Sequence, residues 1–169
     1  MKHKVIDNFL DEEYFNSLEN LFIDKKNTVN VIMPWFFKKT VANDLVENNI
    51  FYMTHMFYDG NRPTSNLYEK LVPLLEKLKA ICLIRVKANF YPNTTVLHEH
   101  PKHIDMDFPN SGAILSLNTC DGYTKLEDGT KINSVANRML LFDPNTEHCS
   151  TTTTNDYARI NININYINV

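Results

Sequence analysis

The first part of the chain shows the spacing of an amphipathic helix. Asp11 is suited to cap a helix over residues 11–23, because its carboxylate can accept hydrogen bonds from the free N–H groups of the first turn. Five apolar residues share one face of this helix: Tyr14, Phe15, Leu18, Leu21 and Phe22. Before the cap, residues 5–10 are predicted to form a short strand.

A second helix is predicted from leucines at helical spacing. They are Leu67, Leu71, Leu74, Leu75 and Leu78. Pro73 lies inside this pattern, so it should kink the helix or mark a late start. Between the two helices, residues 29–58 are rich in aromatic side chains and are predicted to be extended.

From Ile81 onward the pattern changes to short strands separated by turns. Strands are predicted over 81–91, 112–119, 123–127, 138–142, 148–154 and 157–167. The turns lie at Asp121-Gly122, Asp128-Gly129, Asp143-Pro144 and Asn155-Asp156. Because helices and strands do not alternate, a doubly wound parallel sheet is disfavoured. A mainly β fold is expected, an antiparallel sandwich or jelly roll with helices on one face.

The last strand has one apolar and one polar face. The two-residue period of a strand places Ile160, Ile162, Ile164 and Tyr166 on one side. The other side carries Arg159, Asn161, Asn163 and Asn165. An ordinary half-buried strand turns its polar face to solvent. This pattern alone does not decide whether the polar face of the last strand points to solvent or to the interior.

Composition narrows the class of protein. The chain has 169 residues, of which 43% are hydrophobic and 22% charged, so one soluble domain over 1–169 is expected. Its net charge of -3 offers no attraction for a phosphate backbone, and nucleic acid is not expected as a partner. No apolar run reaches the roughly 18 residues of a membrane span, so no membrane partner is expected either.

The cysteines favour a reducing compartment. Cys82, Cys120 and Cys149 are odd in number and form no CxxC motif, which argues against a disulfide framework and a cysteine zinc site. Asp7 interrupts the N-terminal residues before an apolar stretch long enough for the core of a signal peptide can form. We therefore expect a cytoplasmic protein, in the host cytoplasm if it is viral.

Three histidines lie within residues 98–103. His103 and Asp105 project to the same side of an extended segment, so both can reach one metal ion. His148 follows the predicted strand 138–142 and its turn, where a return strand can deliver a third ligand. Two histidines and one carboxylate form the facial triad of non-haem iron(II) oxygenases, which leaves coordination positions open.

Two other residue sets compete with this assignment. His98 and His100, with Asp105 and His148, vaguely resemble a cupin metal site, but the cupin glycines are missing. We interpret His98 and His100 as loop or substrate-side residues. Asp107 shares the face of Asp105 in a straight strand, and is the alternative carboxylate of the triad.

The order of these residues resembles that of the 2-oxoglutarate/Fe(II)-dependent dioxygenases, in particular the prolyl-4-hydroxylase-like branch found among phage proteins. An HxD motif is followed by a hairpin-rich stretch, a single histidine and then an arginine on the last strand. The resemblance covers 81–166, on the segments 85–91, 103–105, 117–124, 137–143, His148 and 159–161. The opening residues 5–10 also resemble the first strand of that family.

The resemblance implies a double-stranded β-helix, with a catalytic core over 81–169 and N-terminal helices from a supporting, substrate-side region 1–80 packed on the major sheet. It implies that His103, Asp105 and His148 hold Fe(II). The resemblance further implies that Arg159 pairs with the distal carboxylate of 2-oxoglutarate, a two-pronged contact that a buried guanidinium suits. The candidates for further co-substrate contacts are Tyr91, Asn89 and Asn161.

By the same resemblance the reaction would consume O2, release succinate and CO2, and hydroxylate a prolyl residue or an amino-acid-like group. The substrate would be a peptide, a protein or a small molecule, and the enzyme a monomer or weak homodimer. Two other classes remain as alternatives. One is a cupin-like metal-dependent lyase or isomerase, and the other a non-catalytic phage structural or binding jelly roll.

Overall fold

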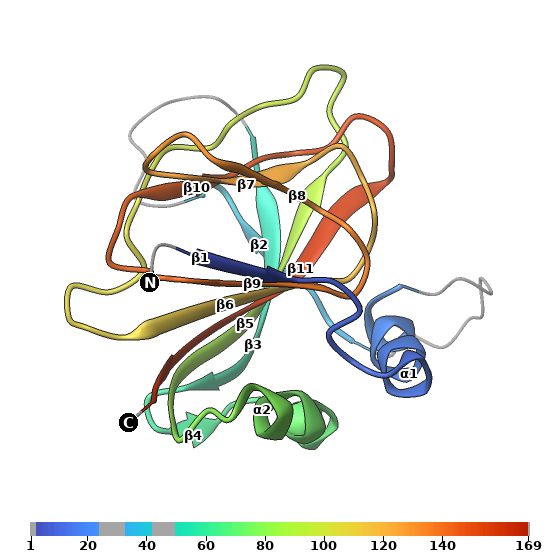
Figure 1. The fold of residues 1–169 in the computed structure, drawn as a ribbon. Coiled ribbons are helices and arrows are strands. Elements are labelled where there is room, and N and C mark those ends of the chain that lie inside the picture. The colour runs from blue at the N-terminus through green and yellow to red at the C-terminus, as the bar shows by residue number, and fades with distance from the viewer. Residues whose placement is uncertain (1–2, 24–32, 42–49, 169) are drawn as a thin grey trace.

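The computed structural model describes residues 3–23, 33–41 and 50–168 (Figure 1). Within these residues an eight-stranded antiparallel sheet has the strand order β1-β9-β6-β11-β5-β3-β2, and β4 pairs with β3. Its strands are β1 (His3–Ile6), β2 (Phe36–Lys38), β3 (Tyr52–Asp59), β4 (Arg62–Pro63), β5 (Cys82–Pro92), β6 (Ser111–Ser116), β9 (Arg138–Phe142) and β11 (Ala158–Ile167). A three-stranded sheet has the order β10-β7-β8. Its strands are β7 (Tyr123–Leu126), β8 (Lys131–Asn133) and β10 (His148–Ser150).

The two sheets face each other, and the large sheet lies between the small sheet and the helices (Figure 1). The result is the mainly β jelly roll, a double-stranded β-helix, that the sequence predicts. A small apolar cluster joins the two sheets on their inner faces. It consists of Ile114, Leu126, Leu140 and Phe142, with Ile132 packed against it.

The helices form where the sequence predicts them. Helix α1 (Glu12–Phe22) begins after Asp11, whose Oδ1 accepts a hydrogen bond from the N–H of Tyr14 at 2.9 Å. Helix α2 (Val72–Leu78) follows a turn of 3-10 helix, η1 (Tyr68–Leu71). Pro73 lies in the first turn of α2, where its missing N–H has no helical partner to lose. Of the two predictions for Pro73, the late start is therefore the correct one.

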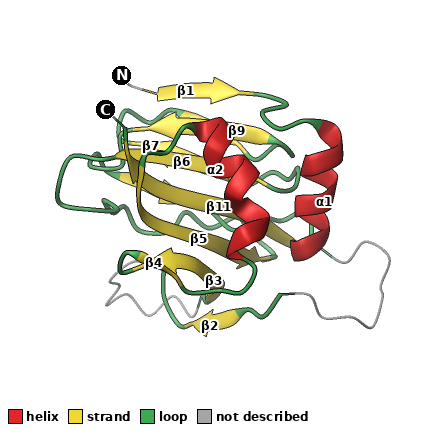
Figure 2. Ribbon diagram, turned by 90° about the horizontal axis from the view of Figure 1, so that it is seen from below, coloured by secondary structure: helices red, strands yellow, loops and turns green. Residues whose placement is uncertain are grey.

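Both helices pack on the same face of the large sheet (Figure 2). The core there contains the apolar face of β11 beneath apolar residues from both helices. Ile162 and Ile164 are fully buried in it, as are Leu71 and Leu74 beside them. Because the apolar face of β11 is turned to the helices, its polar face must point between the two sheets.

Three predicted strands end several residues earlier than expected. The strand over 112–119 corresponds to β6, which ends at Ser116. The strand over 5–10 corresponds to β1, which ends at Ile6, and Asn8 then has a φ of 51°, which an extended strand does not allow. The strand over 148–154 corresponds to β10, which ends at Ser150. Thr151 and Thr153 form isolated bridges to the segment 93–99 instead.

The aromatic stretch 29–58 contains β2 and most of β3, so its described part includes extended chain as expected. Residues 29–32 and 42–49 of that prediction lie outside the described residues. The sequence missed β4 and β8, which are strands of two and three residues. No helix among the described residues is long and apolar enough to cross a membrane.

Candidate metal centre and buried arginine

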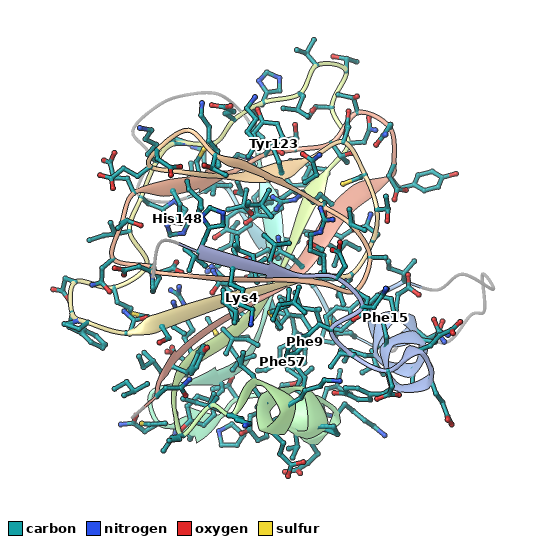
Figure 3. The ribbon with its side chains drawn as sticks, viewed as in Figure 1. Lys4, Phe9, Phe15, Phe57, Tyr123 and His148 are labelled. Carbon is teal, nitrogen blue, oxygen red and sulfur yellow. The ribbon has the colours of Figure 1, made fainter. Side chains whose placement is uncertain are left out.

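A pair of backbone hydrogen bonds brings two histidines side by side. His103 and His148 form an isolated antiparallel bridge, in which each N–H donates to the other residue's carbonyl oxygen at 2.9 and 3.0 Å. Their ring centroids are 4.6 Å apart. His148 lies between the two sheets (Figure 3). The pairing of β10 with the loop before β6 therefore places the two imidazoles side by side, with His148 buried and His103 half-buried.

Asp105 completes a cluster with these histidines. Its backbone N–H donates to the carbonyl oxygen of Pro144 at 3.0 Å, which holds the residue beside the turn before β10. Asp105 Oδ1 is 3.9 Å from His103 Nε2, and Oδ2 is 3.9 Å from His148 Nε2. One ligand atom from each residue lies within 4.8 Å of the others, which suits three ligands around a single metal ion.

The orientation of the imidazoles leaves their Nε2 atoms available. His148 Nδ1 is 3.0 Å from the carbonyl oxygen of Thr146, and His103 Nδ1 is 3.3 Å from that of Pro101. A carbonyl only accepts, so Nδ1 carries the proton and Nε2 keeps its lone pair. His148 Nε2 is buried and has no hydrogen-bond partner among the described residues. This donor set fits a divalent transition metal such as iron(II).

The Asp105 carboxylate is held by three donors. Arg85 Nη2 donates to Oδ1 at 2.8 Å, while Asn165 and Asn163 donate to Oδ2 at 3.0 and 3.2 Å. Burial raises the pKa of Asp105, but the opposing effects of Arg85, His148 and the two amides are larger together and lower it to about 2. Asp105 is therefore ionised at neutral pH, as a metal ligand must be.

Arg159 is a buried cation without an anion. Its side chain is only 1% exposed, and it forms no ion pair within the part of the chain that the structure describes. Nη2 donates to Thr124 Oγ1 at 2.8 Å, but Nε and Nη1 are buried without partners. The guanidinium carbon lies 5.6 Å from the ring centroid of Tyr91. A guanidinium in this state is costly unless an anion binds to it.

His100, interpreted from the sequence as a loop or substrate-side residue, lies beside the arginine site. It lies outside the named strands, as expected of a loop residue, but its side chain is buried and its ring is 5.0 Å from that of Tyr91. Its Nδ1 is 2.9 Å from Ser150 Oγ, and its Nε2 is buried without a partner. Burial and the charge of Arg159 lower its pKa to about 4. His100 is therefore a neutral imidazole close to the buried arginine.

The competing candidates lie elsewhere. His98 and Asp107 are exposed, and neither belongs to the metal-ligand cluster. Asn89 and Asn161 are both buried and bond to each other, with Asn89 Nδ2 donating to Asn161 Oδ1 at 3.0 Å. Because they pair across β5 and β11, these asparagines sit on the polar inner face between the sheets.

A cavity of about 570 Å³ opens beside the cluster, a size typical of sites for small molecules. Its lining includes His103 and Asp105 and, from β5, Asn89 and Tyr91. The remaining lining residues are Val41, Tyr52, Arg85, Lys87, Pro101, Lys102, Ile104 and Asn163. The cavity thus connects the possible metal ligands with Tyr91, the residue that contacts Arg159.

Three solved structures resemble the whole fold. A prolyl-4-hydroxylase from Pseudomonas putida is 14% identical with a TM-score of 0.58, over 98% of this chain and 92% of that chain. A 2OG-Fe(II) oxygenase family oxidoreductase from Burkholderia pseudomallei is 12% identical with a TM-score of 0.66, over 98% and 84%. A prolyl hydroxylase from Trichoplax adhaerens, in complex with a peptide fragment of the hypoxia inducible factor oxygen degradation domain, is 17% identical with a TM-score of 0.63, over 98% and 83%.

No protein-family model matches the sequence, and neither does any curated protein. At these low identities the structural likeness establishes the fold, which is that of the 2OG-Fe(II) oxygenases. The chemistry of this chain depends on its own residues.

Proposed function

We propose that the protein is an Fe(II)- and 2-oxoglutarate-dependent dioxygenase. The observation that carries the proposal is Arg159, a buried guanidinium with two unpartnered nitrogen atoms. Tyr91, which packs against it, lines the same cavity as His103 and Asp105. A metal site alone does not require this cation. A co-substrate that binds a metal at one end and carries a carboxylate at the other accounts for both features.

His103, Asp105 and His148 would hold the metal on one side and leave its other positions free. Iron bound there would supply O2 activation coupled to the conversion of 2-oxoglutarate to succinate and CO2, and to hydroxylation of a substrate. The chain itself fixes the geometry. The Nδ1 hydrogen bonds orient both imidazoles, and Arg85 with Asn163 and Asn165 orients the carboxylate.

Arg159 would bind the distal carboxylate of 2-oxoglutarate. Its free Nε and Nη1 can donate in a charge-assisted way, while Thr124 holds Nη2. Tyr91 packs against the guanidinium, and the unpartnered Nε2 of His100 offers a further polar contact nearby. Asn89 and Asn161 lie on the same inner face and would line the path between this end and the metal.

For the substrate we propose an amino-acid-like group. Support for a prolyl residue in a peptide comes from the Trichoplax adhaerens neighbour, which was solved with a peptide. The phage affiliation, the cytoplasmic location and the monomeric or weakly dimeric state stay predictions. A cupin-like lyase or isomerase and a non-catalytic jelly roll are kept as alternative outcomes of the test.

The proposal is tested by succinate release from the full chain in air with Fe(II) and 2-oxoglutarate. We expect slow release of succinate without any substrate, dependent on both iron and O2, and its loss when Zn(II) replaces iron. Metal-dependent turnover of another kind, without consumption of the keto acid, would favour the lyase or isomerase. Absence of metal binding altogether would favour the non-catalytic jelly roll.

Gly122 provides a prediction about the shape of the arginine site. A Cβ atom at this position would lie 2.6 Å from Arg159 Cδ and 2.7 Å from the backbone oxygen of Thr152. Gly122→Ala is therefore expected to displace Arg159, to destabilise the protein by about 1–3 kcal/mol and to raise the KM for 2-oxoglutarate. Urea unfolding and the succinate assay measure the two effects.

Gly129→Ala is the matched control for this substitution. Gly129 has a φ of +84°, so alanine is strained there too, but nothing lies within 4 Å of the added Cβ. It should lose stability without a change in the KM for 2-oxoglutarate. An equal rise in KM for both variants would show that Gly122 acts only through stability.

A further inference from the structure

The cavity beside the metal cluster contains a second unpaired cation, Lys87. Lys87 lines the cavity from the inner face of β5, where it pairs with Asn163 of β11. Its ammonium lies 5.9 Å from the ring centroid of Tyr52, and it forms no hydrogen bond or ion pair with any described residue. Lys87 is half-buried and faces the cavity without an acidic partner among the described residues, so it attracts a negatively charged ligand to this wall.

The other charges around the cavity do not neutralise Lys87. Arg85 is bound to Asp105, the single acidic residue among those lining the cavity. Lys102 stands at the exposed rim, where Glu147 is 3.6 Å away. Burial, together with the charges of Arg85 and Lys38, lowers the pKa of Lys87 to about 8, although the charge of Asp105 acts in the opposite direction. The cavity wall is therefore positive around Lys87.

Lys87 also lies apart from the arginine site. Tyr91 is the β5 residue opposite Arg159, and Lys87 is four residues earlier on the same strand, about 13 Å away at the usual rise of a strand. A carboxylate at Arg159 would thus leave Lys87 free.

Charge balance in the loaded site points to the substrate as the source of the anion. A metal dication, Asp105, the two carboxylates of 2-oxoglutarate and Arg159 balance one another. Arg85 shares Asp105 with the metal, so Lys87 is the cation in the described cavity wall that still lacks an acidic partner. A substrate carboxylate would pair with it locally, even in a zwitterion of zero net charge. We propose that the substrate is a small molecule with its own carboxylate, such as a free amino acid, and that Lys87 binds this carboxylate.

This inference rests on the proposed function and narrows the class of substrate. A prolyl residue inside a peptide has no charge on its backbone and would leave Lys87 unpaired. A free amino acid presents a carboxylate next to the carbon chain that is hydroxylated. Lys87 would hold that carboxylate by a charge-assisted hydrogen bond and so fix which part of the chain faces the metal.

The test compares acids with their neutral amides. Free amino acids, each paired with its primary amide, are titrated by calorimetry into the full chain loaded with Mn(II) and 2-oxoglutarate, and also into the metal-free protein. We expect at least one acid to bind about 10- to 100-fold more tightly than its amide, the range of a charged hydrogen bond. Equal binding of every acid and amide, or tighter binding of a capped peptide, would overturn the proposal.

Variants of the cavity lysines show which residue causes the preference for the acid over its amide. Lys87→Met should reduce the preference for the acid to less than about twofold, whereas Lys87→Arg should retain most of it because the charge remains. Lys102→Met is the matched control at the rim and should keep the preference. If Lys87→Met discriminates as well as the wild type does, Lys87 does not bind the carboxylate.

A third measurement tests whether Lys87 binds the substrate or 2-oxoglutarate. The affinity for 2-oxoglutarate should change little in Lys87→Met and fall strongly in Arg159→Met. If both variants lose it equally, Lys87 serves the co-substrate and the proposal fails. Should no succinate be released while the acid preference depends on Lys87, the anion site stands and the dioxygenase function falls.

Discussion

Asp105→Ala is expected to abolish succinate formation and to destabilise the metal-free protein by about 3 kcal/mol. The substitution removes the carboxylate from the His103–Asp105–His148 cluster. It also leaves Arg85 without the carboxylate that it contacts at 2.8 Å. Breaking a buried pair costs more than the pair itself contributes, because the remaining charge loses its counter-ion, although Arg85 keeps a hydrogen bond to Asn165. Metal titration and urea unfolding measure the two losses.

Two further variants separate metal binding from folding. Asp105→Asn keeps the shape of the side chain, so it should fold better than the alanine variant and still bind metal weakly. Asp107→Ala is the matched control, because Asp107 is exposed and two residues from Asp105. It should change stability by less than about 0.5 kcal/mol. Loss of metal binding in Asp107→Ala but not in Asp105→Asn would place the carboxylate ligand at 107.

Arg159→Met is expected to raise the requirement for 2-oxoglutarate by about 100-fold, the effect of losing a charged, hydrogen-bonded contact. Iron affinity should stay nearly unchanged, because Arg159 contacts none of the three ligands in the structure. The metal-free variant should be at least as stable as the wild type, since methionine fills similar space without burying a charge. Enzyme kinetics and thermal unfolding test these three statements.

Ligand stabilisation gives a check that does not require turnover. Added 2-oxoglutarate should raise the Tm of the wild type loaded with Mn(II), and should no longer do so in Arg159→Met. Arg138→Met is the matched control, because Arg138 lies in β9 and pairs with Asp7 away from the cavity. If Arg159→Met responds to 2-oxoglutarate as the wild type does, another residue binds the distal carboxylate.

The sequence predicted those parts of the site that depend on local spacing. The HxD motif places His103 and Asp105 close together in any extended chain, and the two-residue period of the last strand separates Arg159 from the isoleucines. The helices followed in the same way from the apolar face of 11–23 and from the late start at Pro73. These features depend on a few neighbouring residues, so the sequence contains the information for them.

Residues whose role depends on distant pairing were not found. Arg85 is an ordinary strand residue in sequence, and only the register of β5 against β11 sets it opposite Asn165, within reach of Asp105. A usable signal was present, because Arg85, Lys87, Asn89 and Tyr91 alternate along their strand as the polar residues of the last strand do. Two strands with polar inner faces indicate a polar cavity between sheets, whereas one strand does not.

The burial of β11 on both faces links correct folding to catalysis. A slip of this strand by one residue against β5 or β6 would turn Arg159 and the asparagines into the apolar layer under the helices and the isoleucines into the cavity. In such a misaligned chain the charge of Arg159 would be buried in the apolar core, and the polar side chains of β11 would be removed from the cavity. The residues proposed to bind 2-oxoglutarate and to orient Asp105 therefore also help to fix the register of β11. Substitutions that make this strand uniformly apolar would allow more misfolded states to compete with the native fold.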